Sequence, residues 1–135
     1  MSSIIAPNGS PLDTAIIGVD NLESSVKFYR DLIGLSVSDY FQWEGKDFEN
    51  IWHLPSGSKA RACFCELENC EVGRILLLDF ISEKKSLIRP KNTTRAYGLF
   101  NLNFYTDDIA NDIHKFSDNG FRIWSKPTFY EMSEG

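Results

Sequence analysis

Residues 12–37, LDTAIIGVDNLESSVKFYRDLIGLSV, combine the signals of a strand, a helix and a second strand. The segment up to Val19 is apolar and rich in β-branched residues, which predicts a buried strand. Asp20 is expected to cap the next element, a helix, and Glu23 stands three residues on, as in a capping box. Gly34 is expected to end this helix. Its core-facing residues recur at helical spacing: Leu22, Val26, Tyr29 and Ile33.

Three strands are predicted after this helix. Residues 35–43 form the first, which ends at the turn Glu44-Gly45, and the aromatic-rich residues 48–54 are ambiguous. Residues 61–67 and 74–81 are predicted to pair as a hairpin. The first half of the chain therefore has the predicted element order β-α-β-β-β.

The same pattern restarts near residue 100. Residues 100–106 predict a strand, Asp107 and Asp108 are expected to cap a helix that Gly120 ends, and residues 121–124 begin another strand. A shift of 87 positions brings the two halves into register, so the chain contains an internal repeat. The second copy has little room for its last strands. The matched pairs are Val19 and Thr106, Asp20 and Asp107, Leu22 and Ile109, Val26 and Ile113, and Tyr29 and Phe116.

Composition narrows the class of protein. The chain has 135 residues, 42% of them hydrophobic and 24% charged, as is typical of about one globular domain. Its formal net charge of −5 argues against nucleic acid or an anionic membrane as a partner. No apolar run is long enough to cross a bilayer, and the N-terminus does not resemble a secretory signal. We therefore expect a cytoplasmic protein.

Three cysteines, Cys63, Cys65 and Cys70, lie close together. In a cytoplasmic protein they are expected to be reduced thiols, although a CxC motif followed by a third cysteine can also hold a metal. The basic stretch 83–97 has the composition of a linker. It is either a solvated connector or a loop that holds an anion over a pocket.

The segment 12–37 resembles the opening module of the vicinal oxygen chelate superfamily, which includes glyoxalase I, extradiol dioxygenases and bleomycin-resistance proteins. Residues 51–62 and 74–80 are similar to the later part of that module in glyoxalase-like members, and residues 101–127 are similar to the start of a second module. The resemblance implies an α+β fold of paired βαβββ modules around a shared pocket. The expected organisation is an extension over 1–11, a first module over 12–82, the linker over 83–97 and an incomplete second module over 98–135.

Members of this family usually bind a divalent metal through His, Glu or Gln side chains in the pocket. The resemblance places two of these positions at Thr14 and Asn101, and neither is a histidine. A third position falls at Leu77, or at Asp79 if the match to the last strand of the family's module is shifted by two residues. We therefore expect no cofactor, and a divalent metal is the alternative.

Polar and aromatic residues are the remaining candidates for a ligand site. Asn101 and Asn103 alternate with apolar residues on one strand, so their amides either hydrogen-bond a ligand or are satisfied within the fold. Aromatic residues either stack on a flat ligand or belong to the core. His53 either lines the pocket as an acid or base or has a structural role, and His114 is expected on a helix surface. The candidate set is Thr14, Asn101, Asn103, Tyr105, Trp43, Phe48, Trp52, His53, Asp79 and Trp124.

The resemblance implies two candidate functions. The first is a glyoxalase-like module without the usual metal-ligand histidines that binds a small, partly aromatic molecule. The second is a metal-dependent lyase, isomerase or extradiol-type dioxygenase, completed by a partner chain or by residues beyond Gly135. Whether the chain is an enzyme stays open. An incomplete second module would leave a sheet edge unpaired, so we expect a homodimer or a partner domain.

Overall fold

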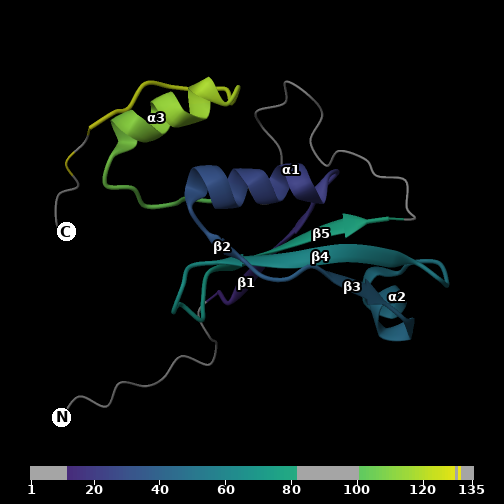
Figure 1. Ribbon diagram of the computed structural model, residues 1–135. Coiled ribbons are helices and arrows are strands. Elements are labelled where there is room, and N and C mark those ends of the chain that lie inside the picture. The colour runs from purple at the N-terminus through teal and green to yellow at the C-terminus, as the bar shows by residue number, and fades with distance from the viewer. Residues whose placement is uncertain (1–11, 82–100, 130, 132–135) are drawn as a thin grey trace, which may run out of the picture. The chain divides into compact units, whose positions relative to one another are not determined.

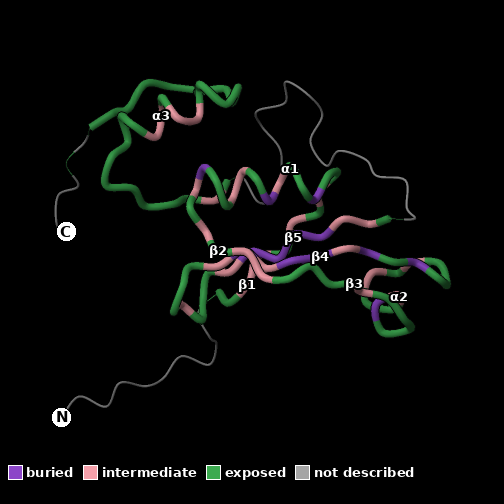
Figure 2. The backbone as a smooth tube through the Cα atoms, viewed as in Figure 1, coloured by how far each residue is buried: buried purple, intermediate pink, exposed green. Residues whose placement is uncertain are grey.

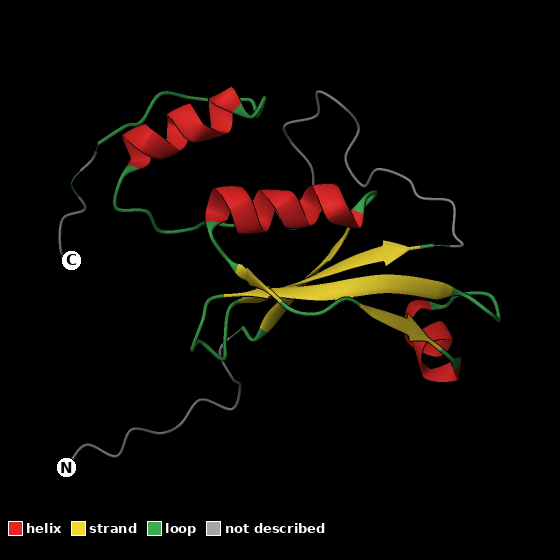
Figure 3. Ribbon diagram, in the orientation of Figure 1, coloured by secondary structure: helices red, strands yellow, loops and turns green. Residues whose placement is uncertain are grey.

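The computed structural model describes residues 12–81, 101–129 and 131, and the chain divides into two units, residues 1–86 and 87–135. The first unit is a twisted sheet with helices on its two faces (Figure 1; Figure 3). Its elements are β1 (Thr14–Gly18), α1 (Leu22–Lys27), η1 (Phe28–Ile33), β2 (Ser36–Val37), β3 (Phe41–Glu44), α2 (Lys46–Trp52), β4 (Lys59–Glu66) and β5 (Arg74–Phe80). The second unit contains α3 (Ile109–Asp118).

The five strands form one sheet with the order β1-β5-β4-β2. β3 also pairs with β4, along residues 59–62, whereas β2 pairs with residues 65–66 of the same strand. β1 runs parallel to β5, and the other pairs are antiparallel. Side chains alternate along each strand, so the register assigns every strand residue to one of two faces. We call the face that α1 covers the α1 face, and the one that α2 covers the α2 face.

The hairpin of β4 and β5 is the centre of the sheet and confirms the predicted pairing. Cys63 pairs with Leu77 and Phe64 with Leu76. Cys63 and Leu77 therefore point to the α1 face, and Phe64 and Leu76 point to the α2 face. Gly73, in the turn between the strands, has a φ of 75°, a conformation that glycine adopts without steric cost.

The cap of the helix that opens the fold lies one residue later than predicted. Asn21, not Asp20, is the N-cap, and its side chain accepts a hydrogen bond of 2.8 Å from the backbone N–H of Ser24. Glu23, the predicted capping-box residue, has a further partner in the sheet. It pairs with Arg61 of β4, so it ties the helix to the sheet.

The predicted second half of this helix is a π-helix, η1. Gly34 closes it with a φ of 91°, and its N–H donates to the carbonyl of Tyr29, five residues earlier. The wider turn changes which side chains reach the sheet. Tyr29 and Ile33, which were predicted to face the core, are only half-buried. Leu32 is the buried residue of this turn.

The segment predicted as one strand over 35–43 contains two short strands, β2 and β3. The ambiguous stretch after it is a helix, α2, which places Phe48 in the core. Phe48 is fully buried on the α2 face, in a cluster with four residues of β4 and β5. These are Ala60, Ala62, Leu76 and Leu78.

The second unit has the predicted helix without the predicted strands. Asp108 caps α3 by accepting a hydrogen bond of 3.0 Å from the N–H of Asn111, which confirms the acidic cap. Residues 101–106 and 121–124 form no strand, because no described segment of this unit pairs with their backbones. None of residues 101–129 is buried (Figure 2). Phe100 and the linker 83–97 lie outside the described residues.

Candidate functional site

The α2 face carries a polar corner at the start of β1 and β5. The Thr14 hydroxyl donates a hydrogen bond of 2.6 Å to Asp13, and Arg74 forms an ion pair of 2.7 Å with the same carboxylate. The hydrogen bond from Thr14 and the Arg74 guanidinium lower the pKa of Asp13. Arg74 also lies 5.1 Å over the ring of Phe64, and its Nε–H is buried without a partner among the described residues. No sequence motif singles out Arg74, because its role comes from the pairing of β1 with β5.

Apolar side chains beside this corner remain open to solvent. Ile16 is 47% exposed and Phe41 is 38% exposed, and their strand register places both on the α2 face. The ring of Phe41 stacks on that of Phe64 at 5.9 Å. The polar corner therefore adjoins an exposed apolar surface.

The opposite end of the α2 face is filled by an aromatic cluster. Trp52 meets Trp43 edge-to-face at 6.3 Å and Phe80 at 5.9 Å, and Phe48 stacks on Phe80. The structure thus brings three candidates together, but Phe48 is core. Trp43 and Trp52 are half-buried, and the indole N–H of Trp52 is buried without a hydrogen-bond partner in the described part of the chain.

Asp79 lies on the other side of the sheet. In the register of β4 and β5, Asp79 stands opposite Arg61, which forms an ion pair with Glu23 of α1. Leu77, two residues before Asp79 on β5, points to the same face. Thr14 pairs with Arg74 on the α2 face. Thr14 and Asp79 therefore point to opposite faces, and no single pocket on this sheet contains both side chains.

The candidates of the second unit lie on an extended segment before α3. The side-chain amide of Asn101 donates a hydrogen bond of 3.2 Å to Oδ1 of Asn103, and both residues are exposed. Tyr105 projects fully into solvent. The two asparagines are together, as their alternation implies, and they satisfy each other in part.

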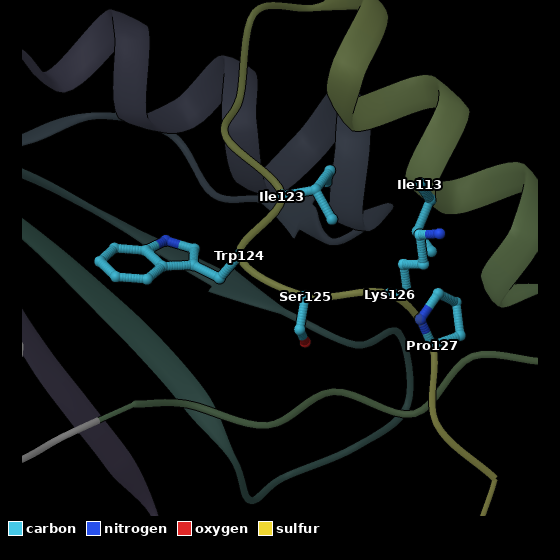
Figure 4. Close-up of a pocket in the computed structure, with 6 residues that line it drawn as sticks. All are labelled: Ile113, Ile123, Trp124, Ser125, Lys126 and Pro127. Atoms are coloured by element: carbon cyan, nitrogen blue, oxygen red, sulfur yellow. The ribbon is translucent and has the colours of Figure 1, made fainter.

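A hollow of about 380 Å³ lies where α3 faces the segment after it (Figure 4). Trp124 stands at one end and Pro127 at the other, and the wall from α3 is Ile113. The Arg122 guanidinium lies 4.8 Å over the indole ring of Trp124. Of the sequence candidates, this hollow contains Trp124 alone. Its full lining is Ile113, Ile123, Trp124, Ser125, Lys126 and Pro127.

Comparison with known proteins identifies the family. The family model of the glyoxalase/bleomycin resistance protein/dioxygenase superfamily matches residues 12–135. The chain belongs to this superfamily. A crystal structure of a glyoxalase family protein from Bacillus cereus is similar, with a TM-score of 0.81 at 20% sequence identity. The similarity covers 94% of this chain and 84% of that one, which supports the α+β fold. A search of curated proteins gave no match.

The two positions that the resemblance assigned to metal ligands, Thr14 and Asn101, carry neutral side chains. Thr14 offers a hydroxyl already bonded to Asp13, and Asn101 offers a neutral amide bonded to Asn103. Asp79 is a better ligand by chemistry, but it lies on the α1 face. In the described part of the chain, no three His, Cys, Asp or Glu side chains are placed to hold a metal ion.

Neither histidine lines the hollow of the second unit. His53 is exposed at the C-terminal end of α2, where its φ of 51° caps the helix in the left-handed conformation. His114 is exposed on α3, as expected for a helix-surface residue.

The cysteines are free thiols. Cys63 and Cys65 are buried beneath α1, and burial raises the pKa of Cys65 to about 12. Cys70 is half-buried, and its thiol donates to the carbonyl of Val72 at 3.3 Å. Among the described helices, none has the length and apolar character to span a membrane.

Proposed function

We propose that this superfamily member binds a small, partly aromatic molecule without a divalent metal. The observation that carries the proposal is the part of the α2 face where Ile16 and Phe41 remain exposed to solvent. There, exposed Ile16 and Phe41 adjoin the hydroxyl of Thr14 and the guanidinium of Arg74. Such a combination of apolar surface with a few fixed polar groups is typical of small-molecule sites. The cell compartment we propose is the cytoplasm, which free cysteines suit.

The loss of the metal is part of the proposal. A divalent cation prefers carboxylate and imidazole donors, whereas the positions at Thr14 and Asn101 supply neutral oxygens. Because Asp79 faces α1, it does not join Thr14 as a ligand. Binding would then depend on hydrogen bonds and on stacking against aromatic rings.

The binding surface can be tested by placing a charge on it. Ile16→Glu on the α2 face should abolish binding of aromatic probe molecules, such as 1-naphthol, measured by chemical-shift changes in the amide spectrum. Val72→Glu is the matched control, since Val72 is 46% exposed against 47% for Ile16 and lies in the turn before β5. Equal binding by both variants would contradict the proposed surface.

The proposal that no divalent metal binds can be tested independently. EDTA should leave the melting temperature unchanged, and zinc, nickel, manganese or ferrous iron should not raise it, because a native-state ligand stabilises by mass action. Metal content per protomer, measured by mass spectrometry on protein purified without chelators, should be near zero. Stoichiometric metal would overturn this part of the proposal.

We also propose that the chain forms a homodimer. The described part of the second unit exposes large apolar side chains and buries none, so it gains stability when another surface covers it. Sedimentation equilibrium at tens of micromolar should show dimer. A monomer that melts cooperatively would contradict this. The most exposed large apolar side chains of this unit are Tyr105, Trp124 and Phe129.

A metal-dependent lyase, isomerase or dioxygenase is the second candidate. The observation that favours it is the absence of strands from residues 101–129, because strands supplied by a partner chain would bring further ligands. Metal bound at one ion per protomer in the dimer, lost from the monomer, would move this candidate to first place.

A further inference from the structure

The charged side chain in the lining of the second unit's hollow is a cation, Lys126. Residues 119–130 contain Arg122 and Lys126 and no Asp or Glu, although the whole chain has a net charge of −5. Among the described residues, neither cation forms an ion pair with a carboxylate. Asp118 and Glu131 flank this stretch, so the attraction of a small anion is a short-range one, from Lys126 in the lining and Arg122 beside it.

Apolar surface dominates the hollow itself. Ile113 of α3 and Ile123 form its wall, and the indole of Trp124 lies at one end with 70% of its surface exposed (Figure 4). The Arg122 guanidinium covers one part of this ring at 4.8 Å. A stacked guanidinium holds the ring in place and adds positive potential beside it.

We propose that this hollow binds a small planar organic anion, such as an aromatic carboxylate. The apolar body of the anion lies against Ile123 and Trp124, and its carboxylate faces Lys126. The volume, about 380 Å³, is at the lower end of the range for small-molecule pockets. It suits a ligand with one aromatic ring or two fused rings. This inference rests on the proposed function, to which it adds the ligand's chemical class and a second binding position.

The test uses 1-naphthoate and its neutral amide, 1-naphthamide, with the full-length chain. The chain has three tryptophans, so three indole N–H signals appear in a ¹H-¹⁵N spectrum, and Trp→Phe variants assign them. The Trp124 signal should shift saturably with naphthoate and much less with naphthamide. Lys126→Gln should weaken naphthoate binding roughly two- to five-fold, as expected for a solvent-accessible ion pair.

Lys27→Gln is the matched control, because it removes one positive charge from an exposed position in α1 of the first unit. It should leave the affinity unchanged, and Lys126→Arg should retain it. Equal shifts of the Trp124 signal with acid and amide would overturn the choice of an anion. Shifts confined to Trp43 and Trp52 would overturn this site but leave the proposed function standing. If no indole signal shifts and Ile16→Glu changes nothing, both proposals fail.

Discussion

The side-chain amide of Asn101 donates its hydrogen bond to Oδ1 of Asn103, two residues along the same extended segment. The distance is 3.2 Å, and both side chains are exposed. One donor of Asn101 is thereby occupied, and Oδ1 of Asn103 accepts it. The pair presents a remaining donor and acceptor in a defined arrangement.

Asn101→Ala should therefore affect ligand binding more than stability. An exposed side chain of this kind contributes at most about 0.5 kcal/mol to the free energy of unfolding. Affinity for a ligand that contacts the pair should fall several-fold, measured by calorimetry with 1-naphthol. Asn50→Ala, at an exposed position of α2, is the control. A large loss of stability in Asn101→Ala would show that the pair is structural.

Phe48→Ala should be strongly destabilising. Phe48 is fully buried between α2 and the sheet, so its removal leaves a cavity and costs about 3–5 kcal/mol. Urea unfolding followed by tryptophan fluorescence measures this, since Trp43 and Trp52 lie in the same cluster. Ile51→Ala in the same helix is 59% exposed and should cost far less. Similar midpoints for the two variants would contradict the placement of α2.

The buried thiols should make stability depend on pH in the alkaline range. Burial raises the pKa of Cys65 from 9.0 to about 12, so the folded state disfavours the thiolate. The stabilising contribution is complete below pH 9, where both states hold the proton. It falls as pH rises toward 12, because only the unfolded state releases that proton. Cys65→Ala should reduce the loss of stability between pH 8 and pH 10.5 in urea titrations.

The same burial predicts the order in which thiols react. Ellman's reagent should modify Cys70 in the native protein, and Cys63 and Cys65 only after unfolding. Rapid modification of all three at neutral pH without denaturant would mean that α1 opens readily. Cys70→Ser is the control that should remove the fast phase.

Asn21→Ala should shorten the first helix at its start. The Asn21 side chain satisfies the N–H of Ser24, and loss of such a cap costs about 1 kcal/mol. Asn21→Asp should retain the cap and most of the stability, as the aspartate does at the start of α3. Equal destabilisation by both substitutions would contradict the capping role.

The repeat was predictable because both helices begin with the same local chemistry. Asn21 and Asp108 are the observed caps, and they lie 87 positions apart, the shift that aligns the two halves. Periodicity and a closing glycine predicted α1 and the β4–β5 hairpin. The choice between Asp20 and Asn21 depends on backbone angles, which residue type alone does not specify, since both residue types are good caps.

Other features depend on tertiary pairing and were not predictable. The strands expected in the second unit need partner backbones, and no described segment of that unit supplies them. The face of Asp79 depends on the register of β5 against β1 and β4, and a shift of one residue would reverse it. The stacking of Arg122 on Trp124 had a signal, since residues two apart share a face of the strand predicted over 121–124.

The π-helical turn from Phe28 to Ile33 marks where this chain could lose one residue without losing its helix. Its hydrogen bonds span one residue more than those of an α-helix, so deletion of a single residue there restores ordinary helical winding. The strands on either side should keep their register through such a change. An alignment gap in this turn should therefore be read as a local rewinding of the helix, and homologues with the shorter helix should present Tyr29 and Leu32 from different angles.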